Sequence, residues 1–256
     1  MLMKKWDRLP PEMRNDAVRS YYDILKKKRL TLICKRLFDI VASLVLLILL
    51  SPVFLILAIA IKADSRGPVF FRQIRVTQYN RRFRIFKFRS MTVNTEKESQ
   101  ITVSGDARVT RVGKFIRRCR LDEISQLLNV LRGDMTFVGT RPEVPRYTER
   151  YTPEMMATLL LPAGITSLAS ILYKDEARLL DCAEDADAVY TETILPAKMR
   201  YNLEQLKKTS LRNDLRVMCM TVFAVLGKDY GAARAGQKKE EVTYGRNHCF
   251  GHRSAL

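Results

Sequence analysis

The chain has 256 residues, enough to bury a hydrophobic core and suited to one domain with appendages. Its formal charge of +18 and pI near 9.9 call for an acidic partner: a nucleic acid, an anionic lipid or a phosphorylated substrate. The scattered, odd set of cysteines (Cys34, Cys119, Cys182, Cys219 and Cys249) argues against a disulfide framework and favours a reducing compartment. The only histidines, His248 and His252, lie in the C-terminal tail, so carboxylates, lysines and arginines must carry any chemistry of the body.

The N-terminal segment, residues 1–34, is basic and lacks the features of a secretory signal. The run Ile40–Ile61 has no charge and is close to the ~20 residues needed to cross a bilayer core. Cations flank it at both ends, whereas a spanning helix should favour one end. Ser51 and Pro52 lie at its middle, where proline bends a helix. Two interpretations stay open: a kinked spanning helix, or a segment 35–63 that enters the membrane, breaks and returns to the same face.

Two strands are expected next, at Val69–Arg75 and Arg82–Arg89, joined by a turn near Tyr79 and Asn80. The stretch from Arg72 to Arg89 has many cations and no acid, which alone indicates a basic face for anionic headgroups or nucleic acid. Residues 92–106 are polar and are interpreted as a mobile cover over a site. An apolar stripe at helical spacing then runs among cations (Val109, Val112, Phe115 and Ile116).

A helix is predicted over about Asp122–Arg132, because Ile124, Leu127, Leu128 and Leu131 recur at the spacing of one helical face. Gly133 fits the position that ends it. Asp122 and Glu123 then lie in the first turn, where unpaired N–H groups favour an ionised acid.

A short strand, residues 135–138, and a turn at Gly139–Pro142 follow, and Pro142 biases Arg141 toward an extended backbone. Each feature alone has an ordinary structural explanation, since an Asp at a helix start is usually a cap and an arginine cluster is usually solvated. Their crowding between Arg117 and Glu143 favours acids and bases that converge on an anion.

The C-terminal third is less informative. Residues 174–192 are acidic and are interpreted as a solvated helix face. A helix at Asp214–Leu226 either packs inside or lies at a membrane interface. The tail, residues 228–256, is basic and expected to be flexible.

Several segments resemble, in family order, the motifs of bacterial sugar transferases, the monotopic phosphoglycosyl transferases that load a sugar phosphate onto a polyprenyl phosphate. The matching pieces are Phe38-Asp39, Ser51-Pro52, Gly67–Gln73, Lys87–Met91, Leu121–Glu123, Gln126–Leu131, Gly133–Met135 and Val138–Pro142. The chain departs from the family at Thr77–Asn80, which lacks the usual glycine-containing turn. It departs again at Leu161–Ser170, where an alanine interrupts a Pro-Gly-Ile-Thr element and the usual Gly-Trp-Ala-Gln continuation is replaced.

The resemblance implies an α+β fold, mostly helical with a small β-hairpin, in a monotopic membrane protein. It favours the re-entrant interpretation of residues 35–63, with the break at Ser51 and Pro52. Residues 64–227 would then form a catalytic domain with interfacial helices, on the cytoplasmic face of the bacterial inner membrane. Longer family members carry an additional multi-helix membrane domain, and this chain is expected to be the minimal form.

The resemblance also implies catalysis by Asp122 and Glu123, with Asp122 as the nucleophile and both carboxylates as ligands of Mg²⁺. Glu123 is assigned either to the metal or to positioning of the lipid phosphate. Lys87, Arg117 and Arg141 are the expected substrate-binding residues. The expected partners are a nucleotide diphosphate sugar, first of all a UDP-sugar, together with polyprenyl phosphate and membrane lipids, but no nucleic acid. The sugar, the pathway and the oligomeric state, a homodimer included, stay open.

Two functions of other classes use the same basic surface: a membrane-tethered nucleic-acid binder and a non-catalytic scaffold. Neither needs Asp122 or Glu123, and a binder of polyanions gains nothing from acids in its groove. The embedded carboxylate pair therefore favours the transferase.

Overall fold

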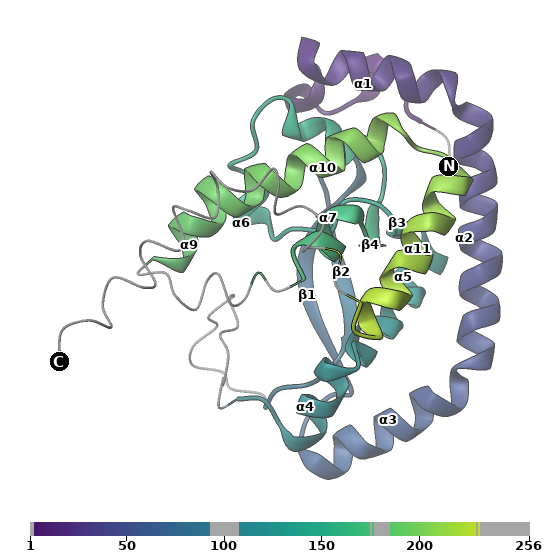
Figure 1. Ribbon diagram of the computed structural model, residues 1–256, viewed down its shortest axis with the longest axis vertical. Coiled ribbons are helices and arrows are strands. Elements are labelled where there is room, and N and C mark those ends of the chain that lie inside the picture. Colours follow the sequence, from purple (N-terminus) through teal and green to yellow (C-terminus); the bar gives the residue numbers. More distant parts are fainter. Residues whose placement is uncertain (1–2, 93–107, 175, 177–184, 229, 231–256) are drawn as a thin grey trace.

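The elements of this computed structural model follow the predicted mixture of helices and small sheets (Figure 1). It describes residues 3–92, 108–174, 176, 185–228 and 230. The helices are α1 (Asp16–Lys27), α2 (Arg29–Leu49), α3 (Ser51–Asp64), α4 (Arg111–Arg118), α5 (Leu127–Arg132), α6 (Pro145–Thr148), α7 (Leu168–Leu172), α9 (Ala186–Val189), α10 (Leu195–Lys207) and α11 (Leu211–Val225). Short 3₁₀ segments are η1 (Trp6–Arg8), η2 (Pro11–Met13), η3 (Gln78–Asn80), η4 (Leu121–Gln126) and η5 (Met155–Leu160), and η6 (Tyr190–Ile194) is π-helical.

The predicted break in the apolar run is confirmed. Helix α2 ends at Leu49, α3 begins at Ser51, and the axis bends by 60° between them. Pro52 lies in the first turn of α3, where its missing N–H leaves no helical hydrogen bond unmade. Neither helix alone has the length and composition of a membrane span, whereas the bent pair together does, among the residues that the structure describes.

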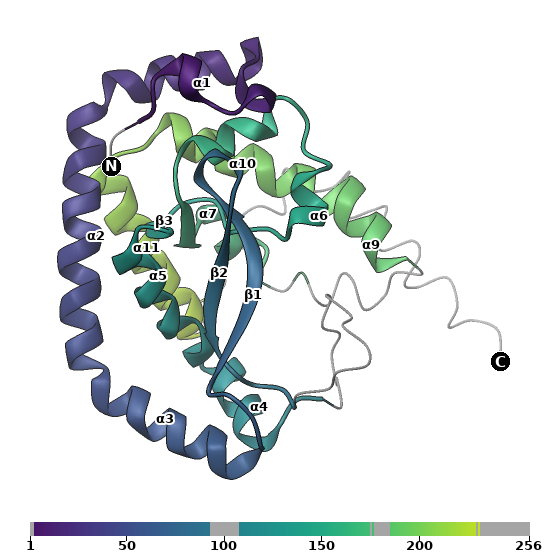
Figure 2. The same ribbon diagram turned by 180° about the vertical axis from the view of Figure 1, so that it is seen from behind.

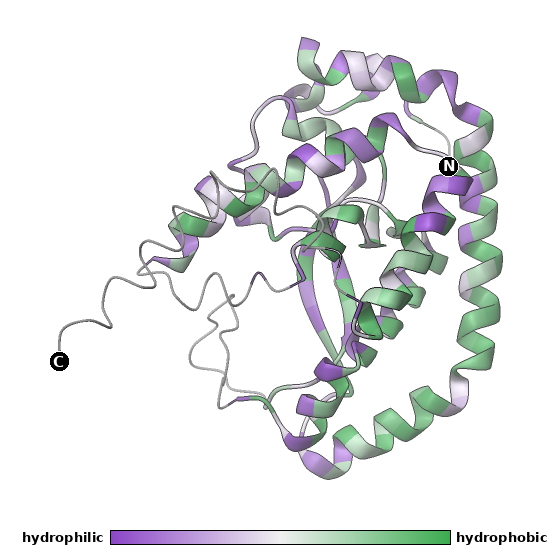
Figure 3. Ribbon diagram, viewed as in Figure 1, coloured by the Kyte–Doolittle hydropathy of each residue, from purple (hydrophilic) through white to green (hydrophobic). Residues whose placement is uncertain are grey.

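Many apolar side chains of the bent pair are exposed, and the ribbon of α2 and α3 is coloured mostly as hydrophobic in Figure 3. Those exposed on α2 and α3 are Leu30, Ile33, Leu37, Val41, Leu44, Val45, Ile48, Leu49, Leu55, Ile56 and Ile59. A continuous surface of this kind is unusual for a protein surrounded by water and indicates an interaction surface.

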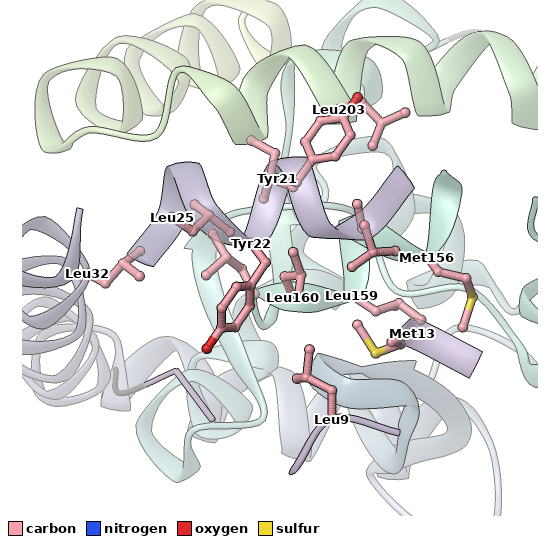
Figure 4. Packing of buried hydrophobic residues seen from close by; sticks show 14 of the residues in the cluster. Leu9, Met13, Tyr21, Tyr22, Leu25, Leu32, Met156, Leu159, Leu160 and Leu203 are labelled. Atoms are coloured by element: carbon pink, nitrogen blue, oxygen red, sulfur yellow. The ribbon is translucent and has the colours of Figure 1, made fainter. Parts of the chain in front are cut away.

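The N-terminal segment is built into the domain that follows the bent pair. Its α1 is capped by Asn15, whose side chain accepts a hydrogen bond from the Val18 N–H at 2.9 Å. One face of α1 packs against η5 and α10 (Figure 4), in a cluster that includes Leu9, Met13, Val18, Tyr21, Tyr22, Leu25, Leu159, Leu160, Leu203 and Leu206. Residues before and after the bent pair therefore share one hydrophobic core.

The predicted hairpin is confirmed as the antiparallel strands β1 (Phe70–Thr77) and β2 (Arg81–Phe88). Its turn contains no glycine, and Tyr79 and Asn80 adopt left-handed φ angles of 58° and 57°. The N-terminal segment supports this turn: the Lys4 N–H donates to the Tyr79 hydroxyl, and the Asn80 amide donates to Glu12, each at 2.9 Å. These contacts explain how the chain dispenses with the family's glycine here.

A second sheet pairs β3 (Met135–Val138) with β4 (Ala163–Thr166) in parallel. Strand β3 was predicted, but β4 was not, because four residues in an atypical sequence motif carry no periodic signal. The Gly139 N–H donates to the Thr166 carbonyl at 3.0 Å, and the Gly164 N–H donates to the Thr140 carbonyl at 2.8 Å. These bonds anchor the start of the loop that carries Arg141.

Gly164 allows this close approach, since a Cβ there would overlap the backbone of Gly139. We expect Gly164→Ala to lower the unfolding free energy by about 3 kcal/mol, because backbone atoms cannot give way as a flexible side chain can. The measurement is thermal unfolding in detergent. The matched control is Gly227→Ala, which has open space and only the cost of a left-handed φ, about 1 kcal/mol. Equal effects of the two substitutions would refute the tight contact.

Helix α11 confirms the predicted C-terminal helix, and its first half packs inside the protein, whereas its place at a membrane interface stays a prediction. Asp214 is buried and forms an ion pair with Lys35 of α2. The far end of the helix exposes Val222, Phe223, Val225 and Leu226. The helix thus joins the body to the bent pair and presents an apolar tip beside it.

The acidic stretch 174–192 is solvated only in part. Asp185 and Glu192 are exposed, but Asp187 pairs with Arg146 and accepts the Tyr147 hydroxyl at 2.8 Å. The solvated-face prediction is therefore wrong for Asp187, whose charge is used to hold α6 against α9. Other expectations concern residues outside the described part: the cover at 93–106, residues 175 and 177–184 of the acidic stretch, and the tail with its two histidines.

Candidate active site

The hairpin positions Lys87 near the end of β2. Side chains alternate along a strand, so Lys87 shares one face of the hairpin with Ile85, Gln73 and Arg75. Phe83 and Ile85 on this face are buried in the core, while the Lys87 side chain remains 22% exposed. The ammonium group therefore lies at the edge of the core, where it can meet both protein and ligand.

Asp122 and Glu123 lie on η4, which runs along the other edge of β2. The Ser125 hydroxyl donates to the Phe86 carbonyl at 3.1 Å, and Asn129 bonds to both Phe86 N–H and the Arg84 carbonyl. These bonds fix η4 and α5 beside Lys87. Arg120, with a left-handed φ of 56°, turns the chain from α4 into η4.

The helix predicted over Asp122–Arg132 is correct only from Leu127 onward. Its first part is the 3₁₀ segment η4, a common form for the start of a helix. Gly133 ends α5 with a φ of 88°, as predicted. Both acids still lie in the first turn.

The structure brings together four of the five predicted site residues. The Arg141 guanidinium donates to Glu123 Oε1 at 2.6 Å. Lys87 Nζ lies 3.8 Å from Glu123 Oε1 and 4.0 Å from Asp122 Oδ2. Both acid side chains are only 15% exposed. Elements far apart in sequence thus converge on one small cluster of two acids and two bases.

The two acids differ in their electrostatic surroundings. Burial raises the pKa of the Asp122 carboxyl, and the Lys87 ammonium partly offsets this effect. Burial also opposes the ionisation of Glu123, but Arg141 and Lys87 outweigh it and lower its pKa to about 2. Burial lowers the pKa of Lys87 to about 8. Glu123 is therefore a firmly held anion, and Asp122 is the more basic and less restrained carboxylate of the pair.

Arg117, the fifth predicted residue, is not drawn into this cluster. It lies half-buried in the last turn of α4, and its side chain makes no hydrogen bond or ion pair with the residues that the structure describes. Its expected contact with substrate stays a prediction.

Arg75 and Glu143 are site residues that sequence reasoning missed. Arg75 donates to Gln73 Oε1 and, at 3.2 Å, to the Pro142 carbonyl. The Val76 N–H donates to the Glu143 carbonyl at 2.9 Å, and the Glu143 carboxylate accepts the buried Tyr190 hydroxyl at 2.8 Å. The backbone on the C-terminal side of Arg141 is thereby fixed to β1 and η6. Only the strand register, which the sequence does not reveal, puts Arg75 next to this loop.

The residues present suit a magnesium ion only in part. No group of three or more His, Cys, Asp or Glu side chains suitable for a metal occurs within the described ranges. Asp122 and Glu123 supply carboxylate oxygens, the hard ligands that Mg²⁺ prefers, and Mg²⁺ commonly completes its shell with water and substrate phosphates. The two carboxylates therefore fit a magnesium ion whose remaining ligands would be water and the phosphate oxygens of a substrate.

A family model described as bacterial sugar transferase matches residues 30–228 of the chain. The chain belongs to this family. The matched region contains the bent helix pair, the hairpin and the whole acid–base cluster, so the resemblance in the motifs extends to the complete site.

Several curated relatives of this bacterial sugar transferase are named as transferases of a sugar phosphate to undecaprenyl phosphate. It is 38% identical over 200 residues to a UDP-glucose:undecaprenyl-phosphate glucose-1-phosphate transferase of Klebsiella pneumoniae, covering 76% of this chain and 40% of that protein. It is 38% identical over 196 residues to a UDP-N-acetylgalactosamine-undecaprenyl-phosphate N-acetylgalactosaminephosphotransferase of Aeromonas hydrophila, covering 75% and 43%. A glucose-1-phosphate transferase of Caulobacter vibrioides is 35% identical over 199 residues, covering 76% and 70%. The chain spans about two fifths of the length of the first two relatives.

Proposed function

We propose that this bacterial sugar transferase moves a sugar 1-phosphate from a nucleotide diphosphate sugar to a polyprenyl phosphate. The observation that carries the proposal is the cluster of Asp122, Glu123, Lys87 and Arg141, in which one carboxylate is held by arginine and its neighbour is not. Such a cluster suits attack on a phosphorus atom by a carboxylate with cations beside it.

The proposed chemistry is two successive displacements at one phosphorus. An Asp122 oxygen attacks the sugar-bearing phosphate, the bond to the bridging oxygen breaks, and a nucleoside monophosphate leaves. An oxygen of the lipid phosphate then attacks the same phosphorus, and the Asp122 carboxylate leaves. Neither step needs a proton, which suits a cluster without histidine. Lys87 and Arg141 would bind the phosphoryl oxygens and stabilise their charge.

The charges of the cluster support a role for Mg²⁺. Its two acids and two bases balance each other, so an entering diphosphate would bring uncompensated negative charge. We propose that Asp122 and Glu123 hold Mg²⁺, which neutralises the diphosphate when bound. Glu123 would position the ion, since Arg141 fixes its carboxylate.

We also propose that the bent pair α2 and α3 is a re-entrant segment that places the site at the cytoplasmic face of the bacterial inner membrane. In support, α1 and the domain after α3 share one hydrophobic core, which requires both ends of the pair to lie on the same side. Its exposed apolar side chains would enter the bilayer. One substrate has a lipid tail and the other is soluble, so the reaction needs a site at this depth.

This topology predicts that α1 and the catalytic domain are labelled from the same side. The side chains of Asp23 and Glu149 are 48% and 68% exposed, and cysteines replacing them, one at a time in a chain without native cysteines, would report on each. We expect a membrane-impermeant maleimide to label both in inverted vesicles and neither in right-side-out spheroplasts. Detergent-opened vesicles provide the control for reactivity. Labelling of the two cysteines from opposite sides would establish a spanning segment and contradict the proposal.

For the donor we propose a UDP-sugar, supported by the names of the relatives from Klebsiella pneumoniae and Aeromonas hydrophila. Those names specify glucose in one case and N-acetylgalactosamine in the other. The sugar therefore has to be measured for this chain.

The test is release of nucleoside monophosphate by the detergent-solubilised protein with Mg²⁺, undecaprenyl phosphate and a panel of nucleotide diphosphate sugars. We expect release with one or a few UDP-sugars, and loss of turnover when EDTA removes the metal. Release that continues in excess EDTA would contradict the magnesium assignment. Failure with every donor of a broad panel, by protein that is folded and monodisperse, would contradict the proposed function.

A further inference from the structure

The hairpin has a second cationic face, opposite the face that carries Lys87. The register places Arg72 and Arg84 on this outer face, together with Phe70, Ile74 and Phe86. Arg72, Arg84 and Ile74 are exposed. The basic character seen in the sequence of the hairpin is therefore divided between two surfaces, and the proposed reaction uses only one of them.

Two guanidinium groups share one aromatic ring on this outer face. Arg72 Cζ lies 4.3 Å and Arg132 Cζ 4.9 Å from the centroid of Phe86, whose side chain is buried. Two like charges held on one ring lie within about one Debye length, ~10 Å, so they repel each other unless an anion joins them. Cation–π contact with the ring fixes both groups in place.

Among the residues that the structure describes, no acid neutralises the arginines of this face. Arg72, Arg84 and Arg132 form no ion pair in the described part of the chain. Asp134, two residues beyond Arg132, is engaged by Arg81 at 2.7 Å. The presence of a cation at Arg132 has a structural explanation, since a positive charge in the last turn of α5 interacts favourably with the helix dipole. That role does not account for the convergence of Arg72 and Arg132 on one ring.

This face borders α3 directly, and it is joined to α2 through α5. A series of ring contacts runs from α3 to the arginines: Phe54 to Phe88 at 5.0 Å, Phe88 to Phe70 at 5.1 Å, and Phe70 to Phe86 at 5.8 Å between centroids. On the other side, Arg36 of α2 donates to the Val130 and Leu131 carbonyls of α5. Figure 2 shows the hairpin with α2 and α3 along two sides of it.

We propose that Arg72, Arg84 and Arg132, here called the outer arginine patch, bind the phosphate headgroup of an anionic membrane phospholipid. The proposal rests on the membrane association in the proposed function. A lipid whose acyl chains lie along the apolar bent pair presents its phosphate at the level where the apolar surface gives way to these cations. Planar guanidiniums match phosphate oxygens in geometry, and the fixed pair pays little ordering cost. The patch serves the enzyme's attachment and lies apart from Asp122.

The test is native mass spectrometry of the full chain in a non-ionic detergent, titrated with phosphatidylglycerol or, in parallel, phosphatidylcholine. We expect the wild type to retain phosphatidylglycerol preferentially. Arg72→Gln with Arg132→Gln should weaken this binding roughly 30-fold, and Arg84→Gln about 5-fold, at ~1 kcal/mol for each cation near the surface. The charge-matched control is Arg8→Gln with Arg14→Gln, two exposed positions on the N-terminal segment, which should bind as the wild type does.

Equal retention of the two lipids by the wild type would overturn the proposal, as would unchanged binding by both patch variants. Displacement of phosphatidylglycerol by equimolar undecaprenyl phosphate would also overturn it, because the patch would then be a site for the acceptor lipid. Arg84→Gln removes no packing on Phe86 and keeps the test valid if the double variant is unstable. Binding is measured without turnover, so failure of this proposal is distinguishable from failure of the transferase assignment.

Discussion

Asp122→Asn is expected to lower release of nucleoside monophosphate by a factor on the order of 10⁴ or more, because removal of a nucleophile blocks the covalent route. The amide matches the carboxylate in shape but does not attack phosphorus. Glu123 is not expected to replace it, since its carboxylate is held by Arg141 at 2.6 Å. The measurement is nucleotide release at saturating donor, with undecaprenyl phosphate present.

The same variant should fold as the wild type does. Burial already raises the pKa of Asp122, so a neutral side chain in its place removes a buried charge. The matched control is Asp23→Asn, which makes the same charge change at a half-exposed position on α1 and should leave release unchanged. Wild-type release by Asp122→Asn would refute the nucleophile assignment, while loss of release together with loss of the thermal transition would not count in its favour.

Lys35→Met is expected to lower the free energy of unfolding by about 3–5 kcal/mol. Lys35 Nζ pairs with buried Asp214 of α11 and donates to the Val138 carbonyl of β3 at 2.9 Å. Removing the ammonium leaves a carboxylate buried without its cation and a carbonyl without its donor. The measurement is thermal unfolding in detergent, and the midpoint should fall by roughly 10 °C.

The control for this substitution is Lys208→Met, which removes a cation whose ion pair with Glu204 is exposed to solvent. Such surface pairs contribute less than about 1 kcal/mol. Lys35→Met combined with Asp214→Leu should recover part of the lost stability, because no unpaired charge is then left at α11. Equal midpoints for Lys35→Met and Lys208→Met would show that the buried pair does not join α2 to α11 as inferred.

The local features of the fold were accessible from the sequence. Pro52 breaks the apolar run, Gly133 ends α5 in a left-handed conformation, and the alternation of residues in 69–89 predicts the hairpin. Each depends on the conformational limits of one residue or on a short period, which a sequence displays directly.

Long-range features were not accessible. The α-helix predicted to begin at Asp122 is a 3₁₀ segment there. Ser125 and Asn129 bond to β2 across some 40 positions, and these bonds shape η4. The parallel pairing of β4 depends on two glycines that meet across the sheet. The packing of α1 into the same core as η5 depends on apolar faces that show no partner in sequence.

For the candidate site too, the sequence predicts individual residues but not the contacts between them. Asp122, Glu123, Lys87 and Arg141 could be named from motifs, but only the fold shows that Arg141 holds Glu123 and leaves Asp122 less restrained. Arg75 and Glu143 could not be named from the sequence, because Arg75 bonds a backbone carbonyl beside Arg141 and Glu143 bonds Tyr190, 47 positions away.

The central claim is that Asp122 carries the sugar phosphate between donor and lipid. Intact-protein mass spectrometry of the enzyme incubated with Mg²⁺ and its UDP-sugar, without lipid acceptor, tests it most directly. The account predicts a mass increase equal to one sugar phosphate, located by peptide mapping at Asp122, absent from Asp122→Asn and removed when undecaprenyl phosphate is added. An active enzyme that shows no such adduct, or that carries it on another residue, would contradict the account.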